Sequence, residues 1–177
     1  MNLICKITDQ DLGIEEKEMI NPVTRTAARG IVVRDDGKIA IFNKVNKNEF
    51  KLPGGGIENN EPPEETFKRE ALEETGCLID IIENLGTAEE YKSQTNFKHI
   101  SYVFLGKVIE DTKQLHITEK EKDEGAVLRW EIPQRALELV TNCYDKLIGS
   151  LDESVYQTKF VVLRDRKILE YYMKNIL

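Results

Sequence analysis

Residues 68–76 read KREALEETG and would place three carboxylates on one side of a helix. Glu70 and Glu74 stand four residues apart and Glu73 lies beside both, so at 100° per residue all three fall within an arc of about 100°. Like charges at this spacing destabilise an isolated helix by roughly 0.2–0.5 kcal/mol per pair. The stretch therefore needs an explanation beyond helix formation.

Apolar side chains border this acidic arc on two sides: Phe67, Ala71 and Leu72. A helix packed on both sides leaves its carboxylates in a groove, where reduced solvation strengthens their repulsion and calls for a compensating cation. Arg69, which we expect to pair with Glu65 and to reach Glu73, supplies a single positive charge. The remaining oxygens suit a hard divalent cation such as Mg²⁺, with Mn²⁺ as a substitute, whereas zinc would prefer Cys or His. Taken alone, the same run is also typical of a solvated helix face.

The flanking residues define the helix and the loop before it. Pro62 and Pro63 suit a first helical turn, and Gly76 suits the position after the last turn, so a helix over 63–75 is predicted. Gly54, Gly55 and Gly56 precede it and allow close approach of the backbone to a ligand. A carbonyl of Gly54 or Gly55 is therefore a further candidate metal ligand.

The remaining chain alternates predicted strands and helices. Strands are expected at 4–8, 28–34, 38–44, 50–53, 77–82, 99–109 and 125–132, and helices at 132–142 and, C-terminally, 160–177. Asp35-Asp36-Gly37 predicts a hairpin turn between the second and third of these strands. The order predicts an α/β fold, a sandwich with a mixed sheet between helices. We find no repeat or linker, so residues 1–177 are expected to form one domain with 1–24 as an N-terminal extension.

Composition excludes several classes of function. The net charge of −7 argues against a binder of long nucleic acid or of anionic membranes, which needs a basic surface. The N-terminus lacks the features of a signal peptide, and no apolar run approaches the ~20 residues of a membrane span. The three cysteines form no metal-binding pattern. We expect a cytoplasmic protein.

A longer pattern joins the glycine loop to the acidic helix. The chain fits G-x5-E-x7-R-E-U-x-E-E-x-G-U, where U is a small or aliphatic residue, at Gly55, Glu61, Arg69, Glu70, Ala71, Glu73, Glu74, Gly76 and Cys77. Seven of these nine positions demand one residue type, a coincidence on the order of 10⁻⁹ per window. Over residues 26–132 the chain resembles the Nudix hydrolases, the MutT-like family, with a complete Nudix box at 55–77.

The resemblance implies a Nudix-type α/β/α sandwich and a Mg²⁺-dependent hydrolase. Such enzymes cleave the phosphoanhydride bond of a nucleoside diphosphate linked to another moiety. The metal ligands implied are Glu70, Glu73 and Glu74, with the carbonyl of Gly54 or Gly55. Arg69 would hold a glutamate in place, and Glu61 would brace the loop. The general base is left open between Glu73, Glu70 and a glutamate of the 117–125 loop. That loop offers Glu119, Glu121 and Glu124, of which Glu119 and Glu121 are the best candidates, with a solvated charge run as the alternative.

Substrate contacts are expected at a few further positions. Arg25 and Arg29 are candidates for phosphate binding, with surface or salt-bridge roles as the alternative. Tyr91 and Phe97 are candidates for stacking on a base. The substrate is open between a nucleoside triphosphate, ADP-ribose or a nucleotide sugar, and a dinucleoside polyphosphate, and capped RNA is disfavoured by the lack of a basic track.

Two other functions fit the same fold. A Nudix-fold module that senses a nucleotide without hydrolysing it would usually carry a damaged box or a DNA-binding segment. An isopentenyl-diphosphate isomerase would need a cysteine and a glutamate in contexts that this chain lacks. A homodimer formed through residues 1–24 is a further expectation.

Overall fold

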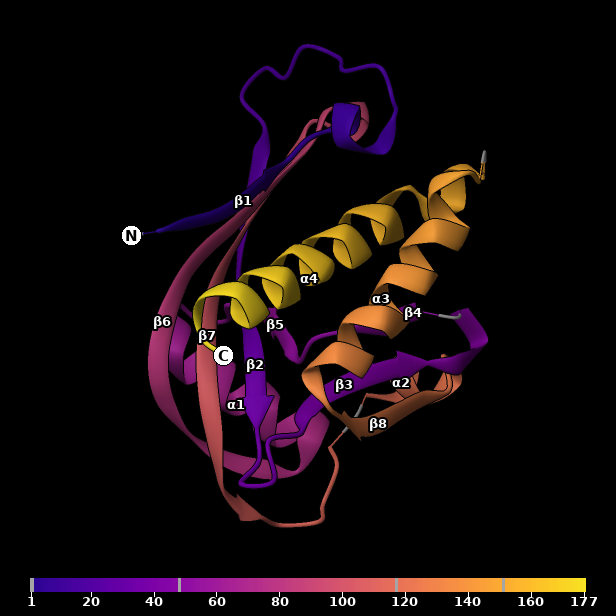
Figure 1. Ribbon diagram of the computed structural model, residues 1–177. Helices are drawn as coiled ribbons and strands as arrows, with labels where there is room; N and C mark the ends of the chain where they lie inside the picture. Colours follow the sequence, from indigo (N-terminus) through magenta and orange to yellow (C-terminus); the bar gives the residue numbers. More distant parts are fainter. Residues whose placement is uncertain (1, 48, 117, 151) are drawn as a thin grey trace.

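The structure is a computed structural model that describes residues 2–47, 49–116, 118–150 and 152–177 (Figure 1). The strands are β1 (Leu3–Ile7), β2 (Val23–Val33), β3 (Ile39–Lys44), β4 (Glu49–Lys51), β5 (Gly54–Gly56), β6 (Cys77–Lys92), β7 (Phe97–Asp111) and β8 (Ala126–Glu131). The α-helices are α1 (Pro63–Thr75), α2 (Glu119–Asp123), α3 (Pro133–Ile148) and α4 (Tyr156–Asn175). Short 3₁₀ turns lie at Asp9–Leu12, Val45–Lys47, Ser93–Thr95 and Glu153–Val155.

The strands form one mixed sheet in the order β1-β6-β7-β2-β3-β4, with β5 paired to β2 and β8 paired to β3. The pairs β1–β6 and β2–β7 are parallel, and the other pairs are antiparallel. Helices α3 and α4 cover one face, and α1 lies behind the sheet on the other (Figure 1). The predicted α/β sandwich is confirmed.

Alternation along β2 divides the core between these two faces. Ile31 packs into the larger cluster under α3 and α4, whereas Ala28 and Val32 pack under α1 with Phe67. The rings of Phe67 and Phe104 stack with their centroids 5.9 Å apart. Burying a side chain such as Phe67 stabilises the fold by roughly 1.5–3 kcal/mol, and here it fixes the acidic helix against the sheet.

The predicted hairpin forms, but its strands separate at once. Gly37 has a φ of 78° in the turn, and Arg34 N donates to Lys38 O at 2.9 Å. Beyond the pair Val33–Ile39, β2 continues beside β7 while β3 turns to β4 and β8. The edge of β2 left free is taken by the three glycines of β5. The divergence of β2 and β3 therefore creates the place for the glycine loop.

Several element boundaries differ from the sequence predictions. β6 continues to Lys92 rather than ending at residue 82, because register shifts in its pairing with β7 keep residues 83–86 in the strand. Helix α3 extends to Ile148, and α4 begins at Tyr156. Within residues 1–24, β1 pairs with β6 and forms one edge of the sheet. In the described ranges, no helix is long and apolar enough to cross a membrane.

Glu124, in the turn between α2 and β8, connects that turn to the end of β3. Its buried carboxylate lies 2.7 Å from Lys44 Nζ and 2.6 Å from Lys47 Nζ. Burial by itself would raise the pKa of this carboxyl, but the two lysines lower it to about 2. Glu124 is thus engaged in a structural ion pair.

Replacing Glu124 with Gln should lower the free energy of unfolding near neutral pH by roughly 1–3 kcal/mol, since it leaves two lysines without their partner. The pair's contribution is fully present above the unfolded pKa of about 4.5 and is lost as pH falls through about 2. Urea denaturation between pH 7 and 2 should show the two proteins converging in acid. Glu119→Gln, at an exposed position, is the control and should change stability by less than about 0.5 kcal/mol. A difference that persists unchanged at pH 2 would contradict this account.

Candidate active site

The guanidinium of Arg69 lies at the centre of the acidic face of α1. Its Nη1 is 2.8 Å from Glu70 Oε1 and 3.4 Å from Glu73 Oε2. Its Nη2 is 2.7 Å from Glu61 Oε1 and donates to Gly56 O at 3.2 Å. One side chain thereby connects three carboxylates and the glycine loop.

Two details of these contacts follow from the position of Arg69. Its hydrogen bond to Glu61 lowers the pKa of that carboxyl to about 2. The prediction that Arg69 pairs with Glu65 is wrong. The guanidinium of Arg69 points to the loop and contacts Glu61, and Glu65 pairs instead with Lys68 at 3.0 Å. The loop offers Arg69 a carboxylate and a carbonyl in a partly buried setting, where an ion pair is stronger than on the open helix surface.

Glu74 ties the other end of the acidic face to the chain before the helix. Its Oε2 accepts a hydrogen bond from Gly54 N at 2.9 Å, and its Oε1 lies 2.7 Å from Lys51 Nζ. Both groups are largely buried, with 5% of the Glu74 side chain and 12% of the Lys51 side chain exposed. Glu74 therefore bonds to the glycine loop and to the strand that leads into it.

The glycine loop needs small residues for a visible reason. A Cβ added to Gly55 would lie 2.2 Å from Glu70 Oε1, and one added to Gly56 would lie 2.4 Å from Arg25 Nη2. At Gly54, φ is +143° and the added atom would meet the backbone of β2. The glycines thus let the carboxylate of Glu70 and the guanidinium of Arg25 approach the loop backbone, and the expected approach to a ligand stays a prediction.

The three box glutamates differ in environment. The side chain of Glu70 is 14% exposed and that of Glu73 is 42% exposed. Burial, followed by the charge of Glu74, raises the pKa of Glu70, and Arg69 opposes the shift. In the part of the chain that the structure describes, no three Asp, Glu, His or Cys side chains converge on one metal-sized site. Cations of the chain itself, Arg69 and Lys51, contact Glu70 and Glu74 in this arrangement.

The predicted substrate residues lie in different places. Arg25 is exposed beside Gly56. Arg29 is buried, and its Nε donates to Ser101 Oγ at 3.0 Å. Burial, together with the nearby positive charge of Arg164, lowers the pKa of Arg29 to about 10. Of the two arginines, Arg25 is the one that presents its guanidinium to solvent at the loop.

The aromatic candidates lie at the far ends of β6 and β7. Tyr91 donates to Glu89 at 2.6 Å, and the ammonium groups of Lys6 and Lys98 each lie 4.7 Å from the centre of its ring. Phe97 packs edge-on against the ring of His99. Their described contacts are with strand neighbours rather than with the glutamates of α1.

The two candidates outside the box lie on α2. Glu119 is exposed and pairs with Lys122 at 2.5 Å. The side chain of Glu121 lies outside the part of the chain that the structure describes. Their part in the site stays a prediction.

Sequence reasoning missed two residues that contact this region. Lys51 bonds to Glu74, and Asp165 of α4 accepts a hydrogen bond from Leu52 N at 2.9 Å. Lys51 could have been suspected from its place three residues before the glycines. Asp165 carries no local signal, because its contact joins residues 113 positions apart.

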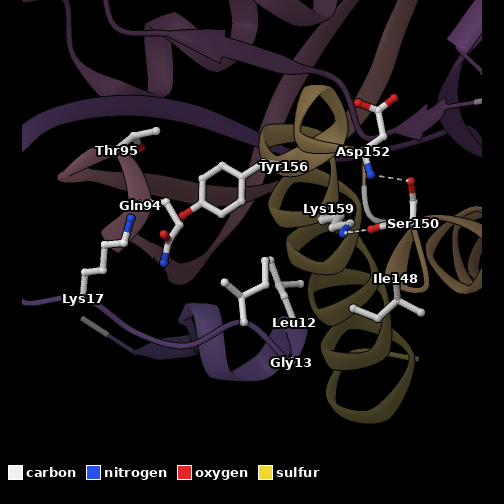
Figure 2. A pocket seen from close by; sticks show the side chains of 11 residues that line it. Leu12, Gly13, Lys17, Gln94, Thr95, Ile148, Ser150, Asp152, Tyr156 and Lys159 are labelled. Carbon is white, nitrogen blue, oxygen red and sulfur yellow. Dashed lines mark hydrogen bonds between the residues drawn. The ribbon is translucent and has the colours of Figure 1, made fainter.

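A cavity of about 520 Å³ lies elsewhere, between the 3₁₀ turn at Asp9–Leu12 and the connection from α3 to α4. Figure 2 shows Tyr156 reaching across it toward Gln94, and Lys159 donating to Ser150 O at 2.7 Å. No box residue is among those that line it. The cavity is therefore not part of the candidate active site.

Comparison with known proteins identifies the family. The model of the NUDIX domain matches residues 23–148, which include the glycine loop and the whole acidic helix. The chain belongs to the Nudix hydrolase family. The matched residues contain the candidate site, and α4 lies beyond them.

Individual relatives agree with this assignment. A MutT-like protein from Streptomyces ambofaciens is 29% identical over 132 residues, 74% of this chain and 79% of that protein. An RNA pyrophosphohydrolase from Xanthomonas campestris pv. campestris is 38% identical over 69 residues, 38% of this chain and 34% of that protein. A NUDIX hydrolase from Nitrosomonas europaea has a similar fold, with a TM-score of 0.55 and 17% identity over 69% of this chain and 86% of that chain.

The substitution Gly55→Ala tests the contact between the loop and Glu70. The added methyl displaces only the end of a flexible side chain, so the melting temperature should stay within a few degrees of wild type. The displaced carboxylate should weaken Mn²⁺ binding on the order of tenfold, measured by electron paramagnetic resonance titration.

Gly149→Ala is the matched control, because a Cβ there meets nothing within 4 Å. It should leave both the melting temperature and Mn²⁺ binding unchanged. Equal Mn²⁺ affinity in Gly55→Ala and wild type would show that Glu70 does not need its present position against the loop.

Proposed function

We propose that this Nudix protein is a Mg²⁺-dependent hydrolase that cleaves the phosphoanhydride bond of a nucleoside diphosphate linked to another moiety. The observation that supports the proposal is the set of contacts made by one arginine of the box: Arg69 joins Glu70, Glu73 and Glu61 to the glycine loop. Pyrophosphate hydrolysis is also named among the relatives.

The donor set fits a hard divalent cation. The groups that would hold it are the carboxylates of Glu70, Glu73 and Glu74 and a carbonyl of Gly54 or Gly55, all of them oxygen donors. A cation would compete there with Arg69 and Lys51 for the same oxygens. When bound, it shields the charge of the diphosphate and makes an attacking water more acidic.

The chain's own residues have separate tasks in this proposal. Glu73, the most exposed box glutamate, takes a proton from the water that attacks phosphorus, with Glu70, Glu119 and Glu121 as the alternatives for this step. Arg69 keeps Glu70 and Glu73 in fixed positions, since it bonds to both. The bond from phosphorus to the bridging oxygen breaks, and that oxygen leaves with the second product.

Arg25 is the proposed phosphate contact. Its guanidinium is exposed beside Gly56, where it can meet an anionic group lying over the loop. Arg29 would act from the neighbouring strand, through the charge that it adds beside Gly54. Tyr91 and Phe97 are kept as proposed base contacts at the end of the sheet.

The substrate classes are those expected from the sequence. They are a nucleoside triphosphate, ADP-ribose or a nucleotide sugar, and a dinucleoside polyphosphate. The RNA pyrophosphohydrolase is matched over about a third of its own length, and the net charge of −7 disfavours a long polyanion. We also propose a cytoplasmic location, on the sequence grounds given above.

The proposal is tested by incubating the protein and Mg²⁺ with these compounds and with 5′-triphosphate RNA, followed by chromatography. We expect one compound to yield a nucleoside monophosphate, and Glu73→Gln to lower kcat by roughly 10²–10⁴-fold because the proton acceptor is lost. Chelation of the metal should abolish turnover.

Glu65→Gln is the control on the same helix, since Glu65 is exposed and pairs only with Lys68 among its described contacts. Its kcat should stay within about twofold of wild type. Tight nucleotide binding without turnover, equal in wild type and Glu73→Gln, would overturn the hydrolase and favour a nucleotide sensor.

A further inference from the structure

Leu52, Pro53 and Gly54, at the entry of the glycine loop, are held by three different elements. Leu52 N donates to Asp165 Oδ2 of α4 at 2.9 Å, and Gly54 N donates to Glu74 Oε2 of α1 at 2.9 Å. Between them, Pro53 O accepts from Gly30 N of β2 at 3.1 Å. Proline has no N–H, so the two amide donors of this tripeptide both go to carboxylates, one on each side of the sheet.

The carboxylate from α4 is itself firmly placed. Asp165 is fully buried, and its Oδ1 accepts from Arg164 Nε at 2.8 Å. Arg164 Nη1 in turn donates to Glu90 Oε1 of β6 at 2.8 Å. A line of buried groups therefore runs from Glu90 of β6 through α4 to the backbone of Leu52.

A contribution to overall stability is a poor explanation for the buried network of Glu90, Arg164 and Asp165. Buried ion pairs often contribute no more than apolar side chains of similar volume, because desolvation of the charges offsets their attraction. An apolar residue at 165 could pack against the sheet, but it could not accept the Leu52 N–H. What Asp165 adds is a directional contact to the backbone three residues before Gly55.

The position of that backbone matters at the site. Gly55 is packed so closely on Glu70 that an added Cβ would lie 2.2 Å from its carboxylate. Gly54 is paired with Arg29 of β2, so the loop is bounded on one side by the edge of that strand. A shift of the loop along β2 would change the distance between its carbonyl groups and the acidic face of α1.

We propose that Asp165 is a positioning residue, through which the C-terminal helix holds the glycine loop in register with the glutamates of α1. Helix α4 crosses the sheet on the face opposite α1 (Figure 1) and lies outside the residues matched by the family model. This inference rests on the proposed function, because it assigns to α4 a part in building that same site.

The test uses the full chain with three substitutions. Asp165→Leu removes the acceptor, Asp165→Asn keeps an oxygen that can accept the Leu52 N–H, and Glu90→Gln disturbs the same buried network without touching the loop. Amide hydrogen exchange at Leu52 and Gly54 reports the loop directly, and Mn²⁺ titration by electron paramagnetic resonance reports the site.

All three variants should have lowered melting temperatures. Only Asp165→Leu should speed exchange at Leu52 and Gly54 by at least tenfold relative to the rest of the sheet and weaken Mn²⁺ binding by about tenfold. Asp165→Asn should restore both readouts to within about threefold of wild type. Should Asp165→Leu not fold, Asp165→Ser makes the same comparison, because its side chain is too short to reach Leu52 N.

The inference is overturned if Glu90→Gln changes amide exchange in the loop and Mn²⁺ affinity as much as Asp165→Leu does. It is also overturned if Asp165→Leu changes neither amide exchange nor Mn²⁺ affinity. The exchange measurement needs no substrate. If the wild-type protein binds Mn²⁺ but hydrolyses no compound, the proposed function fails. The positioning role of Asp165 is then still decided by amide exchange and Mn²⁺ binding.

Discussion

Three carboxylates that share one side of a partly buried helix repel one another, and most features of the site follow from how the chain offsets that repulsion. Arg69 joins Glu70 and Glu73, while Lys51 and Gly54 N bond to Glu74. Each compensating group comes from a different place in the chain. The acidic face is therefore formed only when helix, loop and sheet are assembled together.

The glycine loop is the junction of this assembly. It fits between β2 and the acidic helix because β2 and β3 separate after a single residue pair. The absence of side chains at Gly55 and Gly56 lets Glu70 and Arg25 approach the backbone. The site thus unites an anionic helix face with an exposed arginine across three glycines, an arrangement suited to a cation and a phosphate group together.

The local parts of this arrangement were predictable from the sequence, and the long-range parts were not. The helix at 63–75 was placed correctly because prolines and a glycine mark both of its ends. The strand predicted at 77–82 is longer in the structure, because the register shifts that carry β6 on to Lys92 depend on its pairing with β7. The contacts of Lys51 and Asp165 were not predicted, because they depend on how distant segments pack. The pairing of Arg69 with Glu61 rather than Glu65 was missed for the same reason.

The central claim is that the glutamates of α1 and the glycine loop form a divalent metal site. Anomalous diffraction at the manganese edge, from wild-type crystals soaked in Mn²⁺, tests it most directly. The account predicts a peak within coordination distance of Glu70 or Glu73 and next to the backbone of Gly54 or Gly55. A peak only at other acidic groups, with the box glutamates still on Arg69 and Lys51, would contradict it.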